Sequence, residues 1–212
     1  MILHGMSRSP RVRAALLGLE ETGAPYRLAA MTLGDHLKPE HVARHPFALV
    51  PVLEDGDFTL YETQAILRYL ARLYPQAGLV PDDPRRAGRM DQIMGISEGY
   101  FFQGVTMAIA RERLVAAMRG TAPDEEKIAA ARPLAKTCFA VFDALMGGAP
   151  FLAGPALSLA DLMLVPEFIV LARTPEGEAL LAAQPRLAAW LARMRARPSL
   201  AATEPERLAQ AA

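Results

Sequence analysis

The sequence is poor in the residues that build metal and redox sites. Cys138 is the only cysteine among 212 residues, which excludes an intramolecular disulfide, a Cys-X-X-Cys redox motif and a zinc site of paired cysteines. Two of the four histidines, His41 and His45, have no further metal ligands in a suitable pattern around them. We therefore expect no bound metal.

The chain also lacks an excess of charge and a long apolar run. Lys and Arg number 23 and Asp and Glu number 23, and no basic block stands out, which argues against nucleic acid or an anionic membrane as the main partner. Residues 1–5 lack the charged and apolar regions of a signal peptide. The apolar segment 159–172 is too short and too often interrupted to span a bilayer. We expect a cytoplasmic protein.

What the chain does have is apolar residues, at 52%, enough for the cores of two small domains. Residues 2–4 predict a short strand. Ser9-Pro10 then opens a helix, with Ser9 as the N-cap, and Gly23 ends it. Residues 26–33 predict a second strand, so this part is typical of a parallel strand–helix–strand unit.

The stretch 47–75 predicts a hairpin followed by a helix. Asp55-Gly56 lies between two apolar runs, which is a strong hairpin signal, and residues 57–60 form the expected return strand. Helical spacing then follows, at Ala65, Ile66, Tyr69, Leu70 and Leu73. The predicted element order is β-α-β-α-β-β-α, a thioredoxin-like layout.

The second half of the chain contains no convincing strand. Helices are expected at 85–118, with glycines as bend points, and at 124–146, and Ser158 to Asp161 forms a capping box at the start of another helix. Residues 76–84 are rich in Gly, Pro and Asp and resemble a linker. We predict an α/β thioredoxin-like domain (residues 1–76), a linker (77–84) and an all-α helical bundle domain (85–212).

Two features of the stretch 47–75 predict a binding site. Pro51 begins a strand, and Val50, held extended by the proline after it, can present its N–H and C=O to an extended peptide. Glu62 and Thr63 lie where strand gives way to helix, and the free N–H groups of a helix N-terminus suit a carboxylate. Taken singly, Pro51 is equally typical of a turn and Thr63 of a plain helix cap. The ordered set favours a site.

This order of parts resembles the glutathione-binding half of the soluble glutathione transferases. The residues that carry the resemblance are Val50-Pro51-Val52-Leu53, Leu60-Tyr61-Glu62-Thr63-Gln64-Ala65-Ile66 and Tyr69-Leu70. His45-Pro46-Phe47-Ala48 stands where the family usually has Asn-Pro-Phe-Gly, and the box at Ser158 matches one at the family's sixth helix. The resemblance covers nearly the whole chain. It implies a cis peptide before Pro51, a γ-glutamyl group held by Glu62 and Thr63, and a homodimer.

The resemblance is nearest to the phi and theta types, in which a serine after the first strand hydrogen-bonds the glutathione sulfur. Ser7 matches that catalytic serine, and its hydroxyl would favour the thiolate of a thiol whose free pKa is about 8.5. Spacing alone is equally consistent with a solvated loop serine. Bound glutathione, as a co-substrate, would itself be the nucleophile.

The resemblance also implies further site residues. His36 matches a phi-type histidine that reaches the glycine carboxylate of glutathione, and Lys38 lies one position after the usual lysine, where a mobile surface charge is an equal alternative. Separately from the resemblance, Tyr100, Gln103 and Met107 fall on one helical face, and with Met6 and Arg8 they are expected to line a pocket for an apolar electrophile. Core packing is the alternative for the helical members of this set, and Arg8 replaces a usual small residue.

The sequence thus predicts a glutathione transferase that stabilises bound glutathione thiolate for attack on a small electrophile, an activity typical of detoxification. The alternative enzymatic function is that of a glutathione-dependent isomerase or dehalogenase. The alternative non-enzymatic function is that of a binding module that has the same fold but catalyses no reaction.

Overall fold

The computed structural model describes residues 1–210 and divides into two compact units. The first contains residues 1–80 together with the described residues from Arg195 onward, and the second contains residues 81–194. Within residues 1–210, none of the helices combines the length and the apolarity that a bilayer crossing demands.

The first unit is built on a four-stranded sheet. Its strands are β1 (Ile2–Gly5), β2 (Arg27–Ala30), β3 (Val52–Asp55) and β4 (Phe58–Tyr61), in the order β2-β1-β3-β4. β1 and β2 are parallel, and the other two pairs are antiparallel. The parallel unit and the hairpin expected from the sequence are both confirmed.

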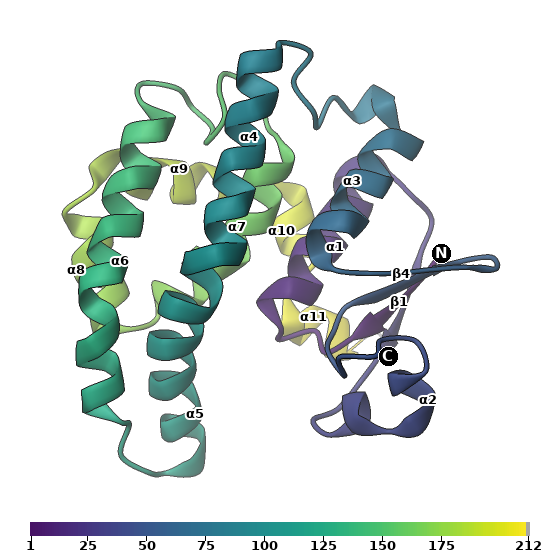
Figure 1. Ribbon diagram of the computed structural model, residues 1–212, viewed down its shortest axis with the longest axis horizontal. Helices are drawn as coiled ribbons and strands as arrows, with labels where there is room; N and C mark the ends of the chain where they lie inside the picture. The colour runs from purple at the N-terminus through teal and green to yellow at the C-terminus, as the bar shows by residue number, and fades with distance from the viewer. Residues whose placement is uncertain (211–212) are drawn as a thin grey trace. The chain divides into compact units, whose positions relative to one another are not determined.

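Helices cover both faces of this sheet. They are α1 (Pro10–Thr22), α2 (Pro39–Val42) and α3 (Thr63–Leu73), with short 3-10 turns η1 (Asp35–Leu37) and η2 (Pro75–Ala77). Figure 1 shows α1 and α3 on one face and α2 on the other. The core lies between the sheet and helices α1 and α3, and it includes Leu3, Val12, Leu16, Leu53, Ile66 and Leu70. The thioredoxin-like prediction is confirmed.

The hairpin turn lies one residue later than the sequence suggested. Asp55 pairs with Phe58, so the two-residue loop is Gly56-Asp57 and β4 starts at Phe58. Gly56 has φ 62°, a left-handed conformation that glycine adopts without a steric penalty. Gly56 is therefore the first residue of the hairpin loop, and Asp55 is the last residue of β3. β2 is also shorter than the expected strand at 26–33.

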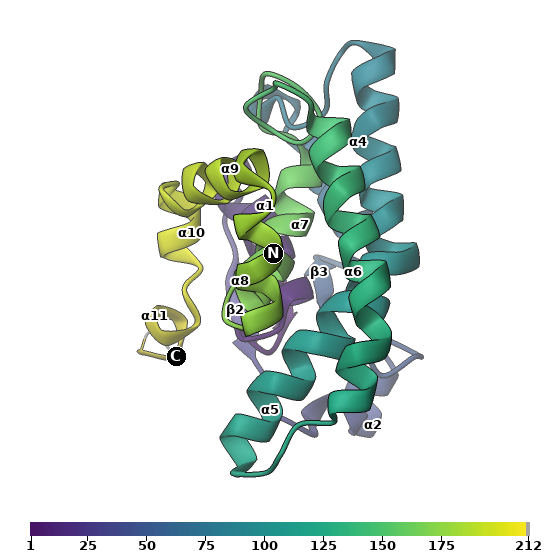
Figure 2. The ribbon, with the colours of Figure 1, turned by 90° about the vertical axis from the view of Figure 1, so that its left-hand side faces the viewer.

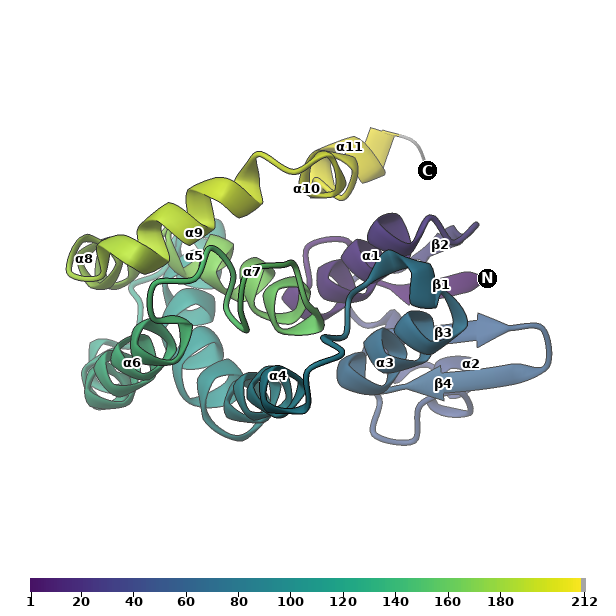
Figure 3. The same ribbon diagram turned by 90° about the horizontal axis from the view of Figure 1, so that it is seen from above.

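Two arginines attach the C-terminal segment to α1. Arg13, which is 5% exposed, donates from Nη2 to the Leu200 carbonyl at 3.0 Å and pairs with Glu204. Arg197 forms a pair of 2.7 Å hydrogen bonds with Glu21. Helix α10 (Pro198–Ala202) therefore lies beside α1, as Figure 3 shows, and α11 (Pro205–Gln210) follows it. The expected helical domain, 85–212, differs from the observed second unit at this end.

The second unit is helical, as predicted. Its helices are α4 (Pro84–Ile96), η3 (Ser97–Arg111), α5 (Glu112–Arg119), α6 (Glu125–Met146), α7 (Leu159–Leu171), α8 (Pro175–Ala182) and α9, which is Pro185–Arg195. In Figure 2, α5 and α6 form the two arms of a helical hairpin.

The expected helix at 85–118 is continuous from Pro84 to Arg119, but its middle segment, η3, is wound as a π-helix. One of the glycines expected to mark a bend has a packing role instead. A Cβ at Gly104 would lie 2.5 Å from Leu134 Cδ2, so glycine allows α6 to approach closely. Such contacts between helices leave no periodic signal in the sequence.

Asp161 connects three segments of the second unit. Its carboxylate is fully buried and accepts from the Leu152 N–H at 2.9 Å, the Ser158 N–H at 2.9 Å, the Ser158 hydroxyl at 2.8 Å and the Trp190 indole at 2.8 Å. The capping box is confirmed. Burial raises the pKa of Asp161, and these donors oppose that rise. The aspartate thus does more than cap α7.

We expect Asp161→Ala to lower the free energy of unfolding by about 3–5 kcal/mol, because several buried donors lose their acceptor. Asp124→Ala is the matched control, since Asp124 caps α6 at an exposed position and its loss should cost about 1 kcal/mol. Urea denaturation of both variants measures the difference. Equal destabilisation would contradict the role of Asp161 as a shared acceptor.

Candidate functional site

The loop between β1 and α1 is a tight turn. The Ser9 N–H donates to the Met6 carbonyl at 2.9 Å, which places Ser7 and Arg8 at the two central positions. A Cβ at Gly5 would collide with the side chain of Val12, so glycine lets the end of β1 lie against α1. The turn is therefore held close to the first turn of the helix.

The two serines of this turn have different environments. Ser9 is the N-cap of α1, and its hydroxyl accepts from the Val12 N–H at 3.5 Å, which confirms the expected cap. Ser7 is half-buried, and its hydroxyl has no hydrogen-bond partner among residues 1–210. Of the two, Ser7 is the one available to a ligand.

Two arginines lie at this turn, Arg8 within it and Arg11 just after it, and only Arg8 was predicted from the sequence to belong to the site. Arg8 is exposed and makes a surface ion pair with Glu206 at 3.3 Å, which contributes little in water. Arg11 lies in the first turn of α1 and is only 6% exposed. Its guanidinium therefore lies near the positive end of the helix dipole. Charged residues in the first turn of a helix are usually exposed, so its burial could not be predicted from the sequence.

The peptide between Val50 and Pro51 is cis, as the resemblance implied. Pro51 is buried and directly precedes β3, while Val50 is half-buried. No backbone hydrogen bond joins Val50 to another residue of the described chain. Its N–H and C=O are thus available for pairing with an extended ligand.

The start of α3 corrects one alternative left open by the sequence. Thr63 is not the cap, because Glu62 occupies the N-cap position with φ 71° and makes no side-chain cap bond. Thr63 is the first helical residue and is 4% exposed. A non-glycine residue at positive φ is uncommon and is often found at binding sites. The unbonded N-terminus of α3 suits an anionic group.

The segment before α2 holds the two other expected ligands of glutathione. Lys38 pairs with Asp35 at 2.7 Å, and Asp35 also accepts from the N–H and hydroxyl of Thr32, both at 2.7 Å. The hydrogen bond from Lys38, with those from Thr32, holds the pKa of Asp35 below its usual value. Lys38 is therefore engaged within its own loop. The Nδ1 atom of His36 is buried without a partner among the described residues.

A cluster of rings that the sequence analysis did not assign to the site lies beside α3. His45 is 2% exposed and stacks on Tyr61, with centroids 4.5 Å apart and planes at 28°. His41 bonds the Leu49 carbonyl through Nε2 at 2.7 Å. Burial lowers the pKa of His45, against an opposing effect of Glu62. These contacts fix Tyr61, the residue that directly precedes Glu62.

The residues expected to line an electrophile pocket belong to both units. Met6 and Arg8 lie in the first, whereas Tyr100, Gln103 and Met107 lie on η3 in the second. Tyr100 and Gln103 are exposed, and Met107 is half-buried. The side chains are accessible, and their joint pocket stays a prediction.

Comparison with known families decides the identity of the fold. Residues 3–78 match the model of the glutathione S-transferase N-terminal domain, and residues 103–198 match that of the C-terminal domain. The chain belongs to the glutathione S-transferase family. The resemblance seen in the sequence is confirmed.

Curated relatives of the family are similar over most of their length. Glutathione S-transferase 4 of Zea mays is 36% identical over 204 residues, 93% of this chain and 88% of that protein. Probable glutathione S-transferase GSTF2 of Oryza sativa subsp. japonica is 31% identical over 201 residues, 94% of this chain and 93% of that protein. These matches favour the phi type.

Solved structures of the family superpose closely. Glutathione S-transferase I from maize, in complex with an atrazine glutathione conjugate, has a TM-score of 0.85 at 29% identity and covers 100% of this chain and 99% of its own. Glutathione transferase F2 from Populus trichocarpa has a TM-score of 0.88 at 22% identity, covers 98% and 99%, and supports the fold alone.

Proposed function

We propose that the protein is a glutathione transferase that binds glutathione, stabilises its thiolate and directs it at an electrophilic carbon. The proposal rests on the different roles of two serines in the turn after β1. Ser9 caps α1, whereas the hydroxyl of Ser7 has no partner in the described chain. The maize structure bound to a glutathione conjugate supports the same activity.

The thiolate is stabilised by donors and positive charge. The Ser7 hydroxyl donates to the sulfur, which lowers the thiol pKa from about 8.5 because the bond favours the charged form. The N-terminus of α1 adds positive potential beside Ser7. The chain offers no thiol of its own for this role, since Cys138 is 3% exposed and burial raises its pKa to about 11.

Glutathione is held along the edge of the sheet. Val50, before the cis Pro51, pairs with its backbone in the manner of an added strand. Thr63 and the free N-terminus of α3 bind the γ-glutamyl carboxylate, and Glu62 accepts from the ammonium. His36 and, once released from Asp35, Lys38 reach the glycine carboxylate.

The electrophile is a small apolar molecule bound by Met6, Arg8, Tyr100, Gln103 and Met107. Conjugation in the cytoplasm, as part of detoxification, is the reaction we favour because the relatives are named as transferases. Isomerisation or dehalogenation with glutathione uses the same thiolate. A binding module without turnover would differ in lacking thiolate stabilisation.

Ser7→Ala should raise the thiol pKa of bound glutathione by about one unit and slow conjugation at neutral pH about tenfold, because one hydrogen bond to a charged group is lost. Titration of thiolate absorbance in the complex measures the shift. Ser9→Ala is the control, and should cost about 1 kcal/mol of stability while leaving the thiol pKa unchanged. Loss of turnover in Ser9→Ala with full activity in Ser7→Ala would refute the assignment of Ser7. If the wild type binds glutathione without lowering its thiol pKa, the non-catalytic binding module is favoured.

Thr63→Ala should weaken glutathione binding about tenfold, because the hydroxyl makes a charge-assisted hydrogen bond to the carboxylate. Its effect on stability should be small, since Thr63 caps nothing. Isothermal calorimetry gives the affinity. Thr59→Ala, at an exposed position of β4, is the matched control and should bind as the wild type does. Equal affinity in both variants would place the site elsewhere.

We infer a homodimer from exposed apolar residues gathered in the first unit. Phe47 is 68% exposed and Leu49 is 55% exposed, and both lie in the segment that packs on Tyr61. Such residues together mark an interaction surface, and closed two-fold dimers are the commonest oligomers.

Phe47→Ser should therefore shift the protein toward monomer in sedimentation velocity at micromolar concentration, through loss of an apolar anchor. Met118→Ser removes an equally exposed apolar side chain from α5 and should leave the sedimentation coefficient unchanged. A wild type that sediments only as a monomer would disprove the dimer.

A further inference from the structure

The middle of the long helix from Pro84 to Arg119 has an unusual winding. Its segment η3 is a π-helix of 15 residues, whereas π-helices are rare and are mostly confined to a single turn. The buried positions of η3 include Ser97, Phe101, Thr106 and Ala110, and they recur at a wider spacing than the three to four residues of an α-helix. So long a π-helix needs a specific cause.

Glu167 of α7 is a buried carboxylate that binds two points of this segment. It is fully buried, and it accepts from the Ser97 hydroxyl at 2.7 Å and, more weakly, from the Thr106 hydroxyl at 3.5 Å. Ser97 and Thr106 are themselves buried. Because a carboxylate is costly to bury unless donors face it, the fold favours a winding of η3 that brings both hydroxyls to Glu167.

Of the α and π windings, the π winding does this. Ser97 and Thr106 lie about two and a half turns apart along an α-helix, which would place them on opposite faces. The hydrogen bonds of a π-helix span one residue more, so the same stretch completes about two turns and the two hydroxyls lie on one face. Glu167 therefore favours the π winding of η3.

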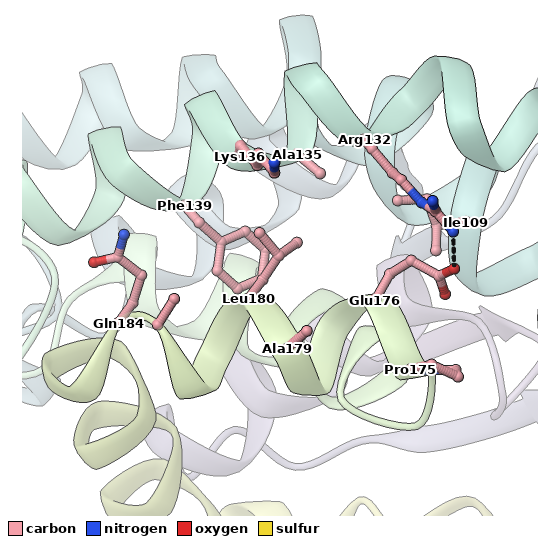
Figure 4. Close-up of a pocket in the computed structure, with 11 residues that line it drawn as sticks. Ile109, Arg132, Ala135, Lys136, Phe139, Pro175, Glu176, Ala179, Leu180 and Gln184 are labelled. Atoms are coloured by element: carbon pink, nitrogen blue, oxygen red, sulfur yellow. Dashed lines mark hydrogen bonds and ion pairs between the residues drawn. The ribbon is translucent and has the colours of Figure 1, made fainter.

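Packing at the far end of η3 does not force this winding. Ile109 borders a cavity of about 450 Å³ between η3, α6 and α8, where Figure 4 shows it with Phe139 and Leu180. Free space beside a helix lets its side chains shift without collision. The choice between the two windings therefore depends on the polar contacts of Glu167.

The winding also decides where the proposed electrophile residues of η3 point. Counted from Ser97, Met107 lies close to three turns on along an α-helix but little more than two turns on along a π-helix. A change of winding would therefore turn Met107 by about half a turn relative to Ser97. Gln103 is nearer to Ser97 and would turn by less.

We propose that Glu167 is a positioning residue for the electrophile. By holding η3 in the π winding, it fixes the directions in which Gln103 and Met107 face the bound substrate. Glu167 acts through η3 and touches neither glutathione nor the electrophile, and its role rests on the proposed transferase function.

Glu167→Met removes the acceptor at a similar volume, so η3 should relax to the α winding, which a crystal structure of the variant shows directly. The KM for the small electrophile chlorodinitrobenzene should rise about tenfold, the loss of one apolar contact. The KM for glutathione should stay within about twofold, because its proposed ligands lie in the first unit.

Two further variants control this result. Glu167→Gln keeps an oxygen acceptor of the same shape and should retain the wild-type winding and both KM values. Asp143→Leu removes a buried carboxylate of α6 that binds Arg186, so it should lower stability and leave the KM for the electrophile unchanged. An unchanged KM for the electrophile in Glu167→Met overturns the proposal, as does a crystal structure of that variant in which η3 is still a π-helix.

A triple variant separates positioning from stability. Ser97→Ala, Thr106→Val and Glu167→Met together remove the two hydroxyls with their acceptor, so neither is left unpaired and part of the stability lost in Glu167→Met should return in urea denaturation. The KM for the electrophile should stay raised, since these contacts no longer select the π winding. Recovery of that KM along with stability would show a structural role alone and overturn the proposal. A wild type inactive toward every electrophile would instead refute the proposed function, and the crystal structures would still decide whether Glu167 sets the winding.

Discussion

The arrangement of the helical unit depends on the buried carboxylate of Asp161. A buried carboxylate without partners is strongly unfavourable, and Asp161 avoids this by accepting hydrogen bonds from Leu152, Ser158 and Trp190. Because those donors lie in three different segments, one side chain fixes the loop after α6, the start of α7 and the position of α9. Trp190 then packs edge-on against Phe168, with ring centroids 5.1 Å apart, and Phe168 also packs against the rings of Phe101, Phe139 and Phe142. A polar constraint therefore positions the apolar core.

The sequence predicted those parts of the fold that depend on local pattern. The Ser9 cap, the Gly23 stop and the box at Ser158 are confirmed because each is decided within a few residues. The attachment of the C-terminal segment to α1 was not predicted, since Arg13 and its partners are separated by nearly the whole chain. The turn at Gly56 was predicted in part. The presence of a turn follows from neighbouring residues, whereas its register depends on the pairing of β3 with β4.

Prediction of the site followed the same division. The cis peptide before Pro51 came from family resemblance, and the structure contains it. The N-cap of α3 is Glu62 and not Thr63. This could not be predicted, because glutamate is not a residue type that is typical of positive φ. His45 gave a weaker signal, by replacing the family's usual asparagine. Its packing on Tyr61 connects the loop before β3 to the start of α3, and only the tertiary structure brings those two segments together.

The assignment of Ser7 follows from a constraint on its neighbour. The connection between β1 and Pro10 contains four residues, and the hydrogen bond from Ser9 to Met6 closes it into one turn. Ser9 must then serve both as the last residue of the turn and as the cap of α1, so its hydroxyl is committed to Val12. Ser7 and Arg8 occupy the central positions, where side chains are not needed to hold the turn. Of these two, only Ser7 offers a small neutral donor that stabilises a thiolate without an ion pair of its own, and the helix start beside it supplies the field.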